Sequence, residues 1–150
     1  MKYYYPVIFY EDPEGGFIGI VPDLPGCLTN GDSLASAMYW IVDAIGTWLE
    51  GVDVKDIPAP SKPSEIDTSE YPNAIVNVIE YDSEKYRRYA AALEADNPIK
   101  AIKEARHLTI KAMALALEMP YRTLQDWISG VHTPPKWLQK LIVEKIERAI

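Results

Sequence analysis

The sequence predicts an α+β protein in two parts: a small sheet with a helix against it, followed by a bundle made only of helices. Three observations support this class. Runs of aromatic and β-branched residues, typical of strands, occur only before residue 82. From residue 98 onward, apolar residues recur at three- and four-residue steps, as on one face of a helix. The net charge also changes sign between the two parts.

The composition is that of an ordinary globular protein. The chain has 150 residues, enough for one domain or two small ones. Hydrophobic residues make up 48% and charged residues 25%, which excludes wholesale disorder. The single cysteine, Cys27, excludes an internal disulfide framework. No apolar run approaches the ~18 residues that cross a bilayer, and the first residues lack the apolar core of a signal peptide, so we expect a cytoplasmic protein.

The chain begins with segments that favour strands. The residues of 3–10 are mostly aromatic or β-branched, and 17–21 forms a second short strand. Between them, 11–16 holds one proline and two glycines, which favour a turn, so the two strands should form a hairpin. A third short strand is expected over 27–30.

One long helix and one further strand complete the first part. Asp32 or Ser33 can cap a helix of about 17 residues, which ends before Gly51. The proline-rich segment 52–72 predicts a long loop. Segment 73–81 carries apolar residues on both faces, which predicts a central strand.

A domain boundary is expected between Glu94 and Pro98, which gives domains 1–95 and 96–150. A helix over 84–95 precedes it, and Asn97-Pro98 ends that helix because the residue before proline avoids the α region.

The second domain should contain four short helices. Pro98 starts the first, Thr109 caps the second over 110–117, Pro120 begins the third over 121–128, and Gly130 ends it. A final helix opens at Pro134-Pro135. Its expected apolar face consists of Trp137, Leu138, Leu141, Ile142 and Ile146.

The two parts carry opposite net charges. Residues 1–97 contain 17 acidic and 6 basic side chains, a net charge of −11, and residues 98–150 contain 5 acidic and 9 basic, a net charge of +4. The basic part therefore suits a polyanion such as a nucleic acid, and the acidic part suits a basic protein.

Two helices of about eight residues joined by a short turn, on a net-positive module, have the layout of a helix-turn-helix. The small Ala114 suits the point where the helices cross, and Met113, Leu117, Leu124 and Trp127 supply a shared core at helical spacing. Tyr121, Arg122 and Gln125 should then face outward at the start of the second helix, where they can reach base edges.

This second domain resembles the phage-repressor (Cro/C1, Xre-type) helix-turn-helix domains over 99–146. The resemblance is carried by Leu108 to Ala114, Arg122 to Trp127, Gly130 and Pro134-Pro135. Three positions depart from the usual pattern: Ile110 replaces a glutamine, Glu118 replaces the turn glycine, and Pro120 replaces a serine or threonine. The alternative is a four-helix bundle used for protein association.

The resemblance implies binding to double-stranded operator DNA, with Arg122 and Gln125 reading bases or Arg122 holding a phosphate. A lone module of this size binds DNA weakly, so a homodimer or higher even oligomer on half-sites about one helical turn apart is expected. The DNA-contacting residues expected are Lys111, Pro120, Tyr121, Arg122, Thr123, Gln125, Lys136 and Lys140.

The first domain resembles the HicB antitoxin domain over 3–81. The matching pattern is a strand at 5–9, a turn at 14–17, and the segment Val21-Pro22-Asp23-Leu24-Pro25-Gly26-Cys27, followed by Gly31-Asp32 and a helix. The resemblance implies a partial ribonuclease H-like fold that binds and blocks a HicA-like mRNA-cleaving toxin. Many members also repress their own operon. The acids expected to steer a basic toxin are Glu11, Asp12, Glu14, Asp23 and Asp43.

Catalysis is not expected. Ribonuclease H chemistry needs metal ions held by carboxylates, yet the strand over 3–10 contains no acid. No cofactor and no metal site are implied, and Cys27 is expected to be a buried structural thiol. Two alternatives to an autorepressing antitoxin remain: a stand-alone transcriptional regulator whose first domain only oligomerises, and a toxin-neutralising protein whose helical module does not bind DNA.

Overall fold

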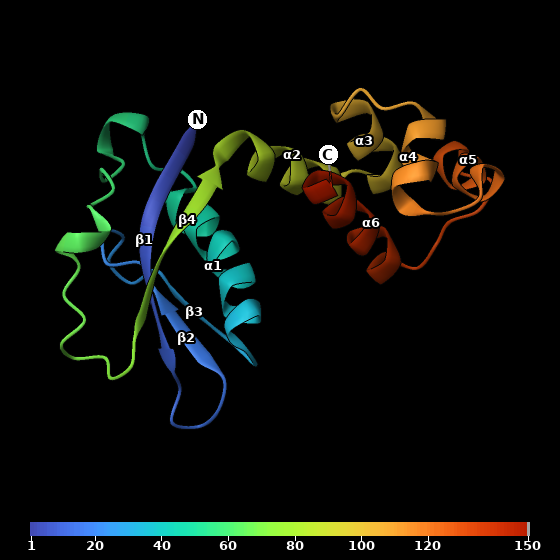
Figure 1. Cartoon of the computed structure of the whole chain (residues 1–150). Coiled ribbons are helices and arrows are strands. Elements are labelled where there is room, and N and C mark those ends of the chain that lie inside the picture. The colour runs from blue at the N-terminus through green and yellow to red at the C-terminus, as the bar shows by residue number, and fades with distance from the viewer. Residues whose placement is uncertain (150) are drawn as a thin grey trace. The chain divides into compact units, whose positions relative to one another are not determined.

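The computed structural model describes residues 1–149, without the side chain of Ala149. It divides the chain into two compact units, Met1–Ser83 and a second that begins at Glu84 (Figure 1). The first combines an antiparallel sheet with a helix and the second is helical, so the predicted α+β class is confirmed. None of the described helices is both long enough and apolar enough to cross a membrane.

The sheet of the first unit has four antiparallel strands in the order β3-β2-β1-β4 (Figure 1). Strand β1 is the longest and lies between two neighbours, with Phe9 opposite Gly19 on one side and opposite Ile75 on the other. The strands are β1 Lys2–Glu11, β2 Phe17–Ile20, β3 Leu28–Gly31 and β4 Ile75–Asp82.

The prediction that segment 73–81 is a central strand was wrong. Strand β4 occupies an edge of the sheet, with β1 on one side only. Apolar residues on both faces suggested burial on both faces, but Ile75 and Val78 are exposed. Strand β1 takes the central place because it pairs along most of its length with β4 and also with β2.

Helix α1, Leu34–Leu49, packs on the sheet face that contains Phe9. Ser33 caps it as predicted, its hydroxyl accepting a hydrogen bond from the amide of Ser36. Two glycines allow the close approach. A Cβ added at Gly19 would lie 2.8 Å from the Phe9 ring, and one at Gly31 would lie 2.4 Å from the amide nitrogen of Ala37. Larger residues at either position would push the strand away from its neighbours.

The loop between α1 and β4 contains two short 3-10 turns, η1 Val54–Asp56 and η2 Pro63–Glu65. It is fixed to the sheet at three points. The Tyr5 hydroxyl donates to the carbonyl of Pro58 at 2.8 Å, Ser61 bonds to Asp23, and the rings of Tyr10 and Tyr71 lie 4.9 Å apart between centroids. The long loop predicted over 52–72 is therefore ordered by specific contacts.

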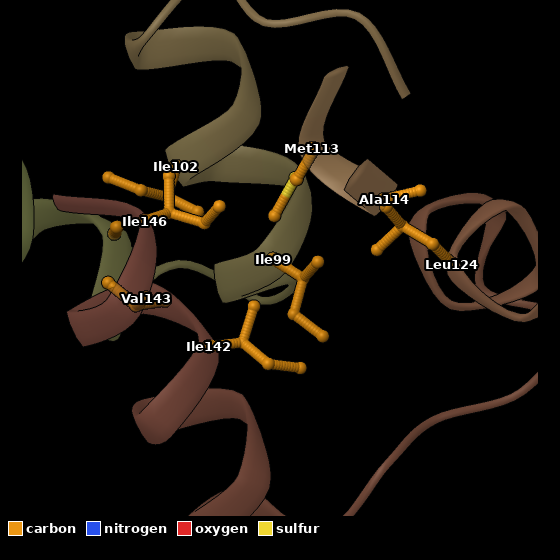
Figure 2. Close-up of a cluster of buried hydrophobic side chains, with 9 residues drawn as sticks. Ile99, Ile102, Met113, Ala114, Leu124, Ile142, Val143 and Ile146 are labelled. Atoms are coloured by element: carbon orange, nitrogen blue, oxygen red, sulfur yellow. The ribbon is translucent and has the colours of Figure 1, made fainter. Parts of the chain in front are cut away.

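The second unit contains five helices around one apolar core. Figure 2 shows this core, whose buried members are Ala92, Ile99, Ile102, Met113, Ala114, Leu124, Ile142, Val143 and Ile146. The helices are α2 Ser83–Glu94, α3 Pro98–Ala105, α4 Ile110–Leu117, α5 Tyr121–Ser129 and α6 Lys136–Ala149.

The division between units lies earlier than the sequence suggested. We expected the helix over 84–95 to close the first domain, but the structure assigns it to the second unit. The reason is packing: Ala92 is buried in the helical core, and Tyr89 and Leu93 pack against it. Asn97-Pro98 interrupts the helix without separating two cores.

The expected apolar face of the last helix was partly wrong. Ile142 and Ile146 are buried with Val143, but Trp137 is 65% exposed and Leu141 52% exposed. Helical spacing groups apolar residues into stripes, and α6 carries two. The core takes the stripe through Ile142 and Ile146 and leaves Trp137 and Leu141 in solvent.

Candidate functional sites

Helices α4 and α5 meet through a small residue and a tight turn. Ala114 is buried and belongs to the same core cluster as the fully buried Leu124 (Figure 2). Glu118, at the turn position, adopts the left-handed conformation with φ 54° and ψ 41°. The amide of Met119 then donates to the carbonyl of Ala114 at 3.0 Å, which ends α4. The glutamate therefore takes the backbone geometry that a glycine adopts without strain.

The start of α5 presents exposed polar side chains and open amides. Tyr121, Arg122 and Gln125 are exposed, as predicted, and Arg122 lies 3.7 Å from the Asp126 carboxylate. Pro120 stands at the N-cap and supplies no side-chain hydrogen bond. In contrast, the side chain of Thr109 caps α4, bonding the amide of Ala112 at 3.1 Å. The first-turn amides of α5 thus lack a side-chain acceptor at the cap.

The remaining expected DNA-contacting residues lie on three elements. Lys111 is exposed on α4, Lys136 and Lys140 are exposed on α6, and Pro120 is exposed before α5. Thr123 differs from the others because it is half-buried, which limits what it can contact.

Asn97 links two helices, a role that the sequence interpretation missed. Its Oδ1 accepts from the amide of Lys100 at 3.1 Å and so caps α3. Its Nδ2 donates to the carbonyls of Trp127 at 3.0 Å and Ile128 at 3.2 Å, near the end of α5. The available signal was an asparagine directly before Pro98, a combination typical of a helix N-terminus.

A buried carboxylate joins α2, α3 and α6. Glu147 Oε1 accepts from Arg88 Nη2 at 2.7 Å and lies 3.4 Å from Arg106 Nη1. Its second oxygen, Oε2, is buried and has no hydrogen-bond partner. Tyr89 adds a bond to Glu144 at 3.1 Å. These contacts hold the last helix against the first two helices of the unit.

The five acids expected to steer a partner are not equivalent. Glu11, Glu14 and Asp43 are exposed. Asp12 accepts from the amide of Glu14 at 3.0 Å and shapes the β1–β2 turn. Asp23 uses both oxygens on Ser61, one on its amide at 2.9 Å and one on its hydroxyl at 2.5 Å, so this acid anchors the loop before β4.

No group of three or more His, Cys, Asp or Glu residues able to hold a metal ion occurs among the described residues. The Cys27 thiol is buried, and this burial raises its pKa to about 11. Burial likewise raises the pKa of Tyr5 to about 12. These two groups therefore stay protonated at neutral pH, where neither acts as a nucleophile.

The charge separation remains with the structural boundary. Residues 1–83 carry 14 acidic and 3 basic side chains, and residues 84–150 carry 8 acidic and 12 basic. The net charges are again −11 and +4, because the segment 84–97 is neutral overall. Each folded unit thus has its own sign of charge.

Comparisons with known proteins place the chain in a family. The family described as "HicB_like antitoxin of bacterial toxin-antitoxin system" matches residues 5–105. An uncharacterised 14.9 kDa protein of Haemophilus phage HP1 is 38% identical over 82 residues, which are 52% of this chain and 60% of the phage protein. A UPF0150 protein of Synechocystis sp. is 34% identical over 62 residues, 41% of this chain and 85% of that protein.

Two solved structures are similar in fold. A chain of the "Toxin-Antitoxin complex from Streptococcus pneumoniae" has a TM-score of 0.51 and 18% identity, and the alignment covers 88% of this chain and 100% of that one. A chain of the "HicA3 and HicB3 toxin-antitoxin complex" has a TM-score of 0.37 and 26% identity over 53% of this chain and 98% of that one. Since the family match spans more than half of its residues, the chain belongs to the HicB-like antitoxins of bacterial toxin–antitoxin systems.

Proposed function

We propose that this antitoxin binds and neutralises a HicA-like mRNA-cleaving toxin through its first unit and represses its own operon by binding DNA through its second. The observation that carries this proposal is the charge separation between two folded units, −11 and +4. A basic toxin and a DNA backbone each require the sign that one unit supplies. Membership in an antitoxin family suggests a regulatory, non-enzymatic role.

The DNA-binding part of the proposal rests on α4 and α5. The short turn at Glu118 and the small Ala114 allow α5 to pack across α4, as the second helix of a helix-turn-helix does. The exposed start of α5 then supplies Arg122 and Gln125 for base edges. Its open amides and positive dipole end suit a backbone phosphate.

The Arg122–Asp126 pair does not oppose DNA binding. It spans 3.7 Å, and the arginine side chain is 85% exposed, so the pair contributes little to folding. Arg122 can therefore leave Asp126 for a guanine edge or a phosphate at small cost. Asp126 also keeps the arginine extended over the helix surface, which limits the side-chain entropy lost on binding.

The DNA-binding test is titration of the full chain with the DNA upstream of its own gene at two salt concentrations. Affinity should fall steeply between 50 and 200 mM salt, by about a hundredfold or more, because phosphate contacts release counterions. The double variant Arg122→Ala with Gln125→Ala should lose sequence preference, and Lys111→Ala should lower the salt slope by about one. Lys55→Ala, in the acidic unit, is the matched control and should bind as wild type. Unchanged binding by the double variant would refute the role of α5.

The toxin-binding test uses the small basic protein encoded beside this chain. Adding the antitoxin should stop RNA cleavage by that protein, and high salt should slow complex formation because opposite charges steer the encounter. RNA cleavage that continues in the presence of excess folded antitoxin would refute this half of the proposal. We also propose that two copies bind together on paired half-sites, which size-exclusion chromatography with light scattering on operator DNA would measure.

A further inference from the structure

Strand β4 is a long, open edge of the sheet. It has eight residues, Ile75–Asp82, and pairs with β1 only, so no strand among residues 1–149 covers its other side. The opposite edge, β3, has four residues and leads directly into α1. A long exposed edge readily pairs with another chain, and folded proteins usually shield such edges.

The backbone of β4 is oriented to receive a strand. Val78 lies opposite Pro6, which has no N–H and so cannot exchange a pair of ladder hydrogen bonds. The N–H and C=O of Val78 therefore point away from β1. The structure agrees, because the Val78 amide donates to the side chain of Asn77 at 2.9 Å. By the two-residue alternation of a strand, Val76 and Glu80 share this outward orientation.

Apolar side chains line this edge. Val78 is 43% exposed, and Ile75 is exposed at the start of the strand. Tyr4, on the neighbouring strand, is exposed and lies on the same face as Val78, because Tyr4 pairs with Glu80 and Pro6 with Val78. An added strand would thus gain backbone hydrogen bonds from β4 and apolar contacts beside it.

The charge around β4 selects the occupant. Glu80 lies on the strand itself, and η2, which ends in Glu65, contacts it. The loop that follows η2 adds Asp67 and Glu70, both exposed. With a net charge of −11 on the unit, a second copy docked here would bring two acidic surfaces together, whereas a basic protein would neutralise them.

We propose that the basic toxin docks on the outer edge of β4 by adding a strand to the antitoxin sheet, with Val78 and Tyr4 as its apolar contacts. This inference rests on the proposed toxin binding and specifies where it occurs. The displaced Asn77 side chain gives up the Val78 amide to a carbonyl of the incoming strand, so one acceptor replaces another and no buried donor is left unpaired.

The test compares two substitutions at one position with a control at the other edge. Val78→Pro removes the outward N–H but no hydrogen bond of the β1 ladder, and proline is tolerated in edge strands. Val78→Lys keeps the N–H and places a positive charge against a basic partner. Leu28→Lys, on β3, makes the same change at a residue that is 58% exposed. Circular dichroism and thermal melting establish that each variant is folded.

The probe is the small basic protein encoded beside this chain, separated from it in denaturant and refolded. Both Val78 variants should bind it at least about tenfold more weakly than wild type, and Leu28→Lys should bind within about twofold. In the wild-type complex, hydrogen exchange should slow at the amides of Val76, Val78 and Glu80. The hydrogen-exchange experiment needs no variant, so it decides the question even if Val78→Pro fails to fold.

Three results would overturn the inference. If folded Val78 variants bind as wild type does, or if exchange slows only outside β4, the toxin docks elsewhere while the proposed toxin binding stands. If the wild-type chain does not bind the basic protein, toxin binding itself fails and this inference with it. If the chain alone forms a dimer that Val78→Pro abolishes, the occupant of the edge is a second copy.

Discussion

Replacing Asn97 should weaken the helical unit more than an ordinary surface substitution would, because one side chain serves two helices. Asn97→Ala removes the cap of α3, worth about 1 kcal/mol. It also removes two donors to the carbonyls of Trp127 and Ile128, each worth about 1 kcal/mol in a partly buried site. The expected loss is about 2–3 kcal/mol.

A second substitution separates the two roles. Asn97→Asp keeps an oxygen that accepts from the Lys100 amide, so the α3 cap survives. It removes both donors and places a carboxylate beside the carbonyls of Trp127 and Ile128, which repel it. We therefore expect Asn97→Asp to lose about 2 kcal/mol or more, although aspartate is a good capping residue.

The assay is hydrogen exchange of the full chain in increasing urea. The amides of Ile102 and Leu124, in the core of the second unit, report its unfolding, and those of Val7 and Phe9 report the first unit. Both Asn97 variants should lower the free energy of unfolding of the second unit only. If Asn97→Ala changes that free energy by less than about 0.5 kcal/mol, the two carbonyl bonds contribute nothing and the reasoning is refuted.

Three further predictions concern other sites. Glu118→Gly should raise the free energy of unfolding by about 1 kcal/mol because glycine adopts φ 54° without strain, whereas Glu118→Ala, which keeps the Cβ, should not; urea unfolding of both variants measures this. Glu147→Ala should destabilise the second unit by about 2–4 kcal/mol in the same assay, since it leaves Arg88 and Arg106 without their shared carboxylate, and the matched Arg88→Ala, which leaves Arg106 paired, should cost less. Cys27 should resist alkylation at pH 8, and the stabilisation from its raised pKa should be complete below pH 9 and fall as the pH rises toward about 11, which alkylation rates and thermal melts at several pH values would show.

Local signals in the sequence predicted local structure well. Thr109 and the spacing of apolar residues after it gave α4 with the bounds that the structure has, and Ser33 was correctly named as a cap. These signals work because a cap and one helical stripe depend on only a few neighbouring residues. The outward direction of Arg122 and Gln125 follows from the same stripe, once Leu124 is assigned to the core.

Features that depend on distant contacts were missed. Whether β4 is central or at an edge depends on which strands pair with it, and apolar residues on both faces fit either position. The exposed stripe of α6, through Trp137 and Leu141, depends on how that helix is rotated against its neighbours. Asn97 could be recognised as a cap from sequence, but its bonds to α5 could not, because its partners are about thirty residues away.

The pairing of the first strand with the last has a consequence in time. Strand β1 leaves the ribosome first and forms the middle of the sheet, yet its long partner β4 is complete only at Asp82, and the amide of Ser83 bonds back to the carbonyl of Met1. The acidic unit therefore cannot close until nearly all of it has been synthesised, whereas α2 to α6 join neighbours in sequence and fold through shorter loops. Until β4 arrives, a newly made chain exposes both β1 and the sheet face that α1 covers, so the rate of its synthesis sets how soon a competent antitoxin exists.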